Sequence, residues 1–309
     1  MAIIMYGQTA YQYWASASGD APLPHVPIRM LQDLRTTNAD VKKLAHFAPE
    51  LSTPYHALVL SAARKHSIDS VTFHTHEQAL PRNSIVEVSD GIYAPCPELC
   101  FVQVARDVDL LRLIRIGYRL CSRFRILPGG VLESRQPPTT PDAIKKYLAD
   151  IGPVHGTVQA TRAVDHVLAN AASPAEIALA MRLTLPHRLG GFALPQPALN
   201  QTVELGSRAA NLAQKRWHEI DLLWEDARLA IEYDSDQVHL DSAAHTDDAI
   251  KRLVLDEMDL QVITVTRSQL KSPELLSKVA LRAAKYLGVR IRPRGKNFAA
   301  MQEALFHLR

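Results

Sequence analysis

The sequence predicts a mixed α/β protein made of two α/β units, and three observations carry this expectation. Short apolar runs with strand-like patterns recur together with helical patterns in both halves of the chain. A stretch rich in Pro, Gly and Thr, residues 128–142, separates the two halves as a linker. The 309 residues are 47% hydrophobic, which excludes a wholly disordered chain. No apolar run reaches the roughly 18 residues of a membrane helix, so we expect no membrane association.

The N-terminal half, residues 1–127, is expected to form the smaller α/β unit. Runs of apolar and β-branched residues predict its strands, and an apolar repeat at helical spacing predicts its helices. Residues 1–50 carry no clear pattern. The expected strands are 55–60, 70–76 and 84–94, the last with a turn at Asp90-Gly91, and the expected helices are 97–108 and 110–124.

The second of these helices is rich in arginine. Leu110, Leu113 and Ile114 mark an apolar stripe, and the arginines are expected on the opposite face. Such a face is either a solvated surface or a contact for DNA phosphates. Arg115 and Arg119 are the candidate DNA contacts.

The C-terminal half, residues 143–309, is expected to hold a helical region followed by a sheet covered by helices. Ser173, Pro174 and Glu176 form a capping box that opens a helix, and residues 188–197 form a break. The other expected helices are 142–151, 157–171, 245–259 and 273–288, and the expected strands lie near 200–206, 217–224, 228–234 and 261–266.

Charge is distributed unevenly along this half. Residues 219–259 hold thirteen acidic and three basic side chains, and residues 281–309 hold seven basic and one acidic. Dense carboxylates beside basic segments suit a metal site that acts on a polyanion, although solvated helix faces give the same pattern.

The chemistry is expected at Asp221 and Glu232. Asp221 lies in an apolar strand, and a short turn leads into a second strand that carries Glu232. Burying a carboxylate is costly unless it is paired or binds a metal. Two carboxylates, a carbonyl oxygen and waters form a ligand set that Mg²⁺ prefers, and Asp234 lies on the same strand face as Glu232. The alternative is that these acids end strands and cap turns.

Two further side chains are candidates. Glu176 either contacts the metal or its water, or serves only the capping box. His239 is either a proton carrier or a hydrogen-bonded structural residue. The three cysteines and the absence of a secretory leader favour a reducing, cytoplasmic location.

Residues 173–285 resemble a DUF559-type domain, a branch of the PD-(D/E)XK endonuclease-like superfamily related to very-short-patch repair endonucleases. The matching positions are Glu176, Asp221, Glu232, Asp234, His239, Asp248 with Arg252, and 262–270. The resemblance implies a restriction-endonuclease-like mixed sheet flanked by helices. It also implies a site that uses Mg²⁺, with Mn²⁺ as a substitute, bound by Asp221, Glu232 and the Tyr233 carbonyl.

The superfamily's lysine, two residues after the second acid, is replaced here by Asp234. That lysine orients or activates the attacking water, so its work falls to Lys251, Arg252 or His239, or is absent.

Residues 53–125 are similar to the AbiEi-like region found ahead of such domains in proteins labelled type IV toxin–antitoxin antitoxins or transcriptional regulators. This resemblance implies DNA and a toxin–antitoxin partner, although residues 1–50 show no clear helix-turn-helix.

The leading hypothesis is a Mg²⁺-dependent nuclease that hydrolyses DNA phosphodiester bonds. The alternatives are a non-catalytic DNA-binding antitoxin or regulator with a degenerate nuclease fold, and a protein-interaction scaffold in a defence system. The choice between DNA and RNA and the oligomeric state are left open by the sequence.

Overall fold

The computed structural model describes residues 2–19, 22–76, 78–234, 258–293 and 297–308. The chain divides into two compact units, Met1–Val167 and Leu168–Arg309. Both are mixed α/β, as predicted. None of the helices in the described ranges combines the length and the apolar character needed to span a membrane.

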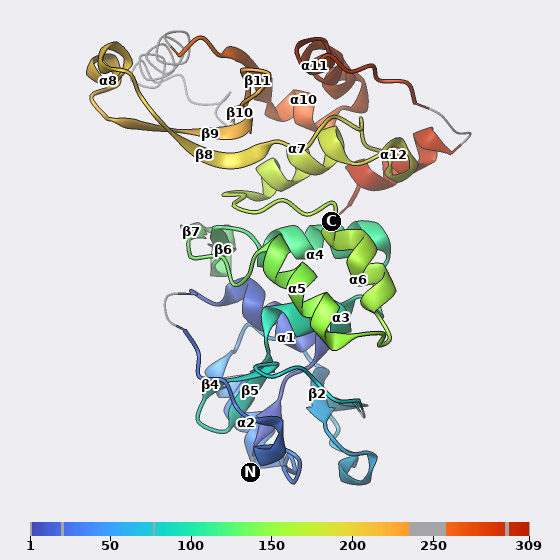
Figure 1. Cartoon of the computed structure of the whole chain (residues 1–309). Helices are drawn as coiled ribbons and strands as arrows, with labels where there is room; N and C mark the ends of the chain where they lie inside the picture. Colours follow the sequence, from blue (N-terminus) through green and yellow to red (C-terminus); the bar gives the residue numbers. More distant parts are fainter. Residues whose placement is uncertain (1, 20–21, 77, 235–257, 294–296, 309) are drawn as a thin grey trace. The chain divides into compact units, whose positions relative to one another are not determined.

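The first unit contains three small sheets (Figure 1). One has the order β1-β5-β4, with β1 parallel and β4 antiparallel to β5. The second is the parallel pair β2-β3, and the third is the hairpin β6-β7. The bounds are β1 Ile3–Ile4, β2 Tyr55–Val59, β3 Val71–Thr75, β4 Ile85–Ser89, β5 Ile92–Pro95, β6 Phe124–Ile126 and β7 Leu132–Ser134.

Six helices accompany these sheets in the described part of the first unit. The predicted strands 55–60, 70–76 and 84–94 and the helices near 97, 110 and 142 are confirmed. The predicted helix 157–171 is shorter and ends at Val164. The bounds are α1 Gly7–Ser16, α2 Asn38–Phe47, α3 Pro97–Val104, α4 Leu110–Leu120, α5 Pro141–Ile151 and α6 Thr157–Val164, with 3₁₀ turns at Ile28–Met30, Ala62–Arg64 and Pro128–Gly130.

The boundary between the units differs from the predicted linker at 128–142. Part of that stretch is β7, which pairs with β6. Arg135 is 6% exposed and donates through Nη1 to the carbonyls of Trp14 and Ala17, at 2.5 and 3.0 Å. Proline, glycine and threonine therefore mark a turn and an extended segment inside the first unit.

Helix α5 also belongs to the first unit, although its residues were expected at the start of the second. Tyr147 and Ile151 pack in a core cluster with Ile4, Leu58 and Ile85. The Tyr147 hydroxyl lies 2.7 Å from Ser84 Oγ, so a buried hydrogen bond ties α5 to the residue before β4.

The second unit is built on a four-stranded sheet with the order β11-β10-β9-β8 (Figure 1). The pairs β8–β9 and β9–β10 are antiparallel, and β11 runs parallel to β10. All four strands were predicted from their apolar runs. Their bounds are β8 Ala198–Glu204, β9 Trp217–Trp224, β10 Leu229–Asp234 and β11 Gln261–Thr266.

Helices α7, α10 and α11 contact one another in succession, and both α10 and α11 contact β11 (Figure 1). Helix α11 confirms the predicted helix 273–288, and α8, α10 and α12 were not predicted. The predicted helix 245–259 lies almost wholly outside the described residues. The bounds are α7 Pro174–Thr184, α8 Ser207–Ala213, α10 Arg267–Lys271, α11 Pro273–Tyr286 and α12 Phe298–Phe306, with a 3₁₀ turn at His187–Leu189.

The break after α7 depends on two glycines. Gly190 has a φ of 85°, and a Cβ there would lie 2.3 Å from the Met301 carbonyl oxygen of α12. A Cβ on Gly191 would lie 2.1 Å from the Leu185 carbonyl oxygen. Both positions therefore require glycine for close backbone approach.

Candidate functional site

The β9–β10 ladder ends next to Asp221 and Glu232. The β9–β10 ladder pairs Trp224 with Leu229, Leu223 with Ala230 and Leu222 with Ile231. Asp221 and Glu232 are the next residues on the two strands, one step beyond this last pair. The turn after Trp224 therefore places both predicted acids at the same end of the β9–β10 ladder.

Asp221 reaches across to the backbone of β10. Its Oδ2 accepts a hydrogen bond from the Tyr233 backbone N–H at 2.7 Å. The carboxylate therefore lies against the residue that follows Glu232. A hydrogen bond to the ionised form of a carboxylate favours that form, so this contact helps keep Asp221 negatively charged.

Glu232 is 4% exposed and lies in the interior beside a histidine that the sequence analysis did not single out. His218 of β9 is 6% exposed, and its Nε2 is 4.0 Å from Glu232 Oε1. A buried carboxylate needs polar neighbours, and His218 supplies one. Its position in the apolar strand 217–224 was the only sequence indication of this role.

Glu176 is linked to this sheet through Asn200 of β8. Asn200 Nδ2 donates to Glu176 Oε2 at 2.5 Å and to the Asn170 carbonyl at 2.9 Å. The β8–β9 register pairs Leu199 with Leu222 and Gln201 with Ile220, which puts Asn200 level with Asp221. Asn200 has a φ of 48°, a left-handed conformation that asparagine tolerates better than most residues. Sequence patterns did not identify it.

The capping role of Glu176 is present in the structure. Its Oε1 accepts from the Ser173 hydroxyl at 2.7 Å, and its Oε2 accepts from the Ala172 backbone N–H at 2.8 Å. The Ser173 hydroxyl in turn accepts from the Glu176 backbone N–H at 3.2 Å. These bonds satisfy backbone donors at the start of α7, and with the Asn200 contact they engage both carboxylate oxygens.

The far end of β10 carries Tyr233 and Asp234, both half-buried. Asp234 pairs in register with Thr266, so Arg267, the first residue of α10, follows directly beside it. Burial raises the pKa of the Tyr233 phenol, while the positive charge of Arg267 opposes this and Asp234 adds to it. Arg267 is therefore an exposed cation close to this end of the strand, and the sequence analysis did not name it.

The donor chemistry of this region fits a hard divalent cation in part. Asp221, Glu232 and the Tyr233 carbonyl are oxygen ligands of the kind that Mg²⁺ binds. Within the described ranges, no group of three or more His, Cys, Asp or Glu side chains is arranged to hold a metal ion. One Asp221 oxygen already accepts the Tyr233 N–H, so the described side chains do not form a complete metal cage.

The remaining predicted residues lie elsewhere. His239 and Arg252 are outside the described residues. Arg115 and Arg119 are both half-buried on α4 in the first unit. The Arg119 guanidinium lies 4.5 Å from the Phe124 ring centroid, and burial lowers its pKa. Its position favours a packing role over the fully solvated face expected from the spacing.

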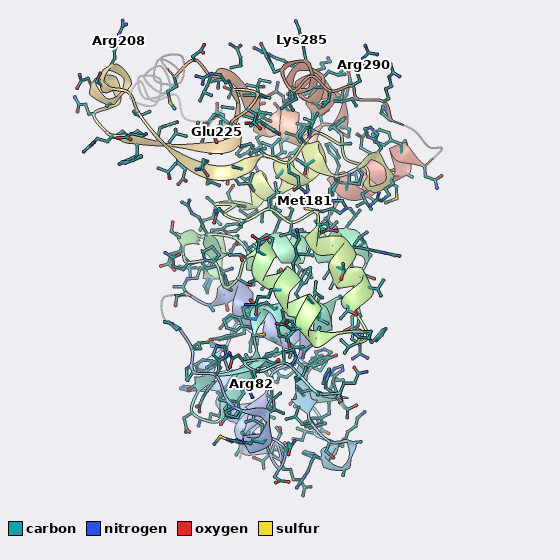
Figure 2. All side chains as sticks on the ribbon, viewed as in Figure 1. Arg82, Met181, Arg208, Glu225, Lys285 and Arg290 are labelled. Carbon is teal, nitrogen blue, oxygen red and sulfur yellow. The ribbon has the colours of Figure 1, made fainter. Side chains whose placement is uncertain are left out.

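Basic side chains gather on and after α11 in the second unit. Lys285 and Arg290 are exposed and extend away from the ribbon in Figure 2. Arg282 on the same helix is also exposed. These residues form a cationic surface of the kind that contacts phosphates.

No protein-family model, no curated protein and no solved structure matches the chain.

Proposed function

We propose that the second unit is a restriction-endonuclease-like domain that binds a divalent metal ion through Asp221 and Glu232 and hydrolyses DNA phosphodiester bonds. The observation that carries this proposal is the contact between Asp221 and the Tyr233 N–H, because it brings an acid of β9 against the residue after the acid of β10. Mg²⁺ is the proposed ion, and Mn²⁺ would replace it.

The order of elements supports the same proposal. Glu176 opens α7, Asp221 lies in β9, Glu232 and Asp234 lie in β10, and a parallel strand β11 follows. This is the order of motif elements in the DUF559-type pattern.

Each residue of the site has a proposed task. Asp221, Glu232 and the Tyr233 carbonyl would hold the ion. A bound divalent ion supplies water activation and charge stabilisation at the phosphate. Glu176 positions Asn200 on β8 beside Asp221 and is a positioning residue rather than a ligand in this scheme. Arg267 supplies positive charge at the end of β10, and the surface of Arg282, Lys285 and Arg290 would bind the DNA backbone.

A second function is favoured by one specific observation. Both Glu176 oxygens accept hydrogen bonds from the protein, and Glu232 is 4% exposed. A carboxylate that accepts hydrogen bonds from the protein, as Glu176 does, stabilises the fold without a metal ion. A non-catalytic DNA-binding protein, an antitoxin or regulator with a toxin partner, would keep the same structure.

Metal binding tests the proposal without relying on cleavage. Mn²⁺ titrated into the full chain and followed by electron paramagnetic resonance would report bound ion directly. We expect Asp221→Asn to weaken Mn²⁺ binding by about tenfold or more, because it removes a charged ligand. Glu225 is an exposed acid on the turn between β9 and β10, labelled in Figure 2, and Glu225→Gln is the matched control. Equal Mn²⁺ affinity in wild type and Asp221→Asn would favour the non-catalytic function.

A further inference from the structure

The first unit contains a pocket of about 370 Å³ that plays no part in the proposed nuclease site. It lies between the end of β3, helix α3 and the loop before α6. The volume suits a small metabolite, since ligand pockets range from about 300 to 1,000 Å³. The lining residues used below are Tyr6, His76, Gln103, Arg106 and His155.

A buried amide in this pocket has an unused donor. Gln103 is 4% exposed, and its Oε1 accepts from the Gly7 backbone N–H at 2.9 Å. That bond fixes the amide orientation, because only the oxygen can accept. Its Nε2 is buried and has no hydrogen-bond partner among the described residues. A buried donor without a partner is costly, and a ligand oxygen would satisfy it.

Arg106 brings a positive charge to the same pocket. Its Nη1 donates to the Tyr6 hydroxyl and its Nε to His155 Nδ1, both at 2.8 Å. Both acceptors are uncharged. The His155 ring accepts through Nδ1, so that nitrogen carries no proton, and burial raises the pKa of the Tyr6 phenol. Within the described ranges, no carboxylate forms an ion pair with Arg106. Asp107, the next residue, acts on Tyr6 only through its charge.

The surrounding residues hold this arrangement in place. Tyr6 stacks on His74 with ring centroids 4.2 Å apart. Gly156 has a φ of 103°, and a Cβ there would lie 2.4 Å from the Val102 carbonyl oxygen. The glycine therefore lets the loop that carries His155 lie directly against α3. His76 also lines the pocket, and its Nε2 is buried without a hydrogen-bond partner in the part of the chain that the structure describes.

We propose that this pocket binds a small molecule through a carboxylate or phosphate group, with Arg106 as the cationic contact and the Gln103 amide as a buried donor. Both groups offer oxygens that accept from a guanidinium and from an amide, and pairing with the charge makes these bonds strong. His76 Nε2 offers a third contact in the tautomer that carries the proton at this atom.

The proposal can be tested on the full chain labelled with ¹⁵N-glutamine. Inorganic phosphate and succinate are the two probes, and sodium chloride at equal ionic strength is the salt control. The Gln103 side-chain resonance is assigned by its absence in Gln103→Glu. We expect a saturable shift of this resonance with one or both probes and none with chloride, and the probe that binds more tightly identifies the class of anion.

Three variants make the test specific. Arg106→Gln should weaken binding by about tenfold or more. Gln103→Glu keeps the acceptor for Gly7 but places a carboxylate toward Arg106, so calorimetry should detect no anion binding while the thermal midpoint is retained or raised. Arg64→Gln removes a half-buried arginine that pairs with Asp33 and should bind as wild type. No saturable shift in wild type, or equal binding by Gln103→Glu, would overturn the proposal.

Discussion

The backbone N–H of Tyr233 donates to the carboxylate of Asp221 across the β9–β10 pair at 2.7 Å. Asp221 thereby occupies the end of the ladder between the two strands, one position beyond the last pair, Leu222 with Ile231. Loss of this acid would leave the Tyr233 N–H with a weaker acceptor. A test must therefore separate the structural role of Asp221 from its chemical role. Asparagine does this, because its side-chain oxygen can still accept the Tyr233 N–H while the negative charge is lost.

The helix cap at α7 has a defined energetic role. Ser173→Ala removes the acceptor for the Glu176 N–H and should lower the free energy of unfolding by about 1 kcal/mol. Glu176→Gln should also destabilise the fold, because it weakens bonds to Ala172 and Ser173. Urea unfolding of each variant measures both effects. If Glu176 is a metal ligand instead, Glu176→Gln would reduce Mn²⁺ affinity as much as Asp221→Asn does.

The two glycines after α7 differ in role from a glycine elsewhere in the second unit. Gly191→Ala should destabilise the protein by about 1–3 kcal/mol, since the added Cβ would overlap the Leu185 carbonyl oxygen. Gly206→Ala is the control, because a Cβ there meets nothing within 4 Å. Thermal and urea unfolding of the two variants should show a clear difference. Equal stabilities would contradict the close approach at Gly191.

Arg119 is expected to contribute more to folding stability than to DNA binding. Arg119→Ala removes the contact with Phe124 and a side chain that hydrogen-bonds Tyr11, and should cost about 1–3 kcal/mol. Arg112 on the same helix is exposed, and Arg112→Ala should change stability by less than about 1 kcal/mol. Chemical denaturation gives both values. If Arg119→Ala leaves the free energy of unfolding unchanged but weakens DNA binding and flattens its salt dependence, the result would favour a phosphate contact by Arg119.

The first unit should lose stability in mild acid. Burial and the neighbouring His56 lower the pKa of His74 to about 4, from an ordinary value of 6.5. Between these two pH values the unfolded chain binds a proton that the folded protein does not, so stability falls as the pH drops from about 6.5 to about 4. His76 acts in the same direction, since burial and Arg106 lower its pKa.

A His74→Phe variant tests this dependence. Phenylalanine keeps an aromatic ring against Tyr6 but cannot titrate. Denaturation curves recorded across this pH range should show a shallower loss of stability in the variant than in wild type. An identical pH dependence would show that other groups cause the acid sensitivity.

The sequence predicted β2 to β5 and β8 to β11, because these are short apolar runs bounded by turn residues, but it did not predict β1, β6 or β7. The closeness of the Asp221 and Glu232 carboxylates stays a prediction, and the contact observed between the two strands there is the hydrogen bond from the Tyr233 N–H to Asp221. Residues 1–50 gave no prediction because β1 spans two residues and three of the four buried residues of α1, Gly7, Thr9 and Ala10, are not large apolar residues.

Other features depend on tertiary contacts that spacing does not encode. The arginine spacing of α4 located a helix face, but it did not reveal that Phe124 covers Arg119. The segment 128–142 had linker composition, yet Arg135 binds the end of α1 from within it. His218 and Asn200 joined the site only through the strand register, which no local pattern specifies.

The most direct test of the nuclease account is a plasmid-nicking assay with Mg²⁺ and Mn²⁺ on purified wild type, Asp221→Asn, Glu232→Gln and Glu225→Gln. The account predicts metal-dependent nicking by wild type and Glu225→Gln, stronger with Mn²⁺, and its loss in Asp221→Asn and Glu232→Gln, with all four proteins folded. Nicking of equal strength in wild type and Asp221→Asn, or none in wild type with either metal, would contradict it.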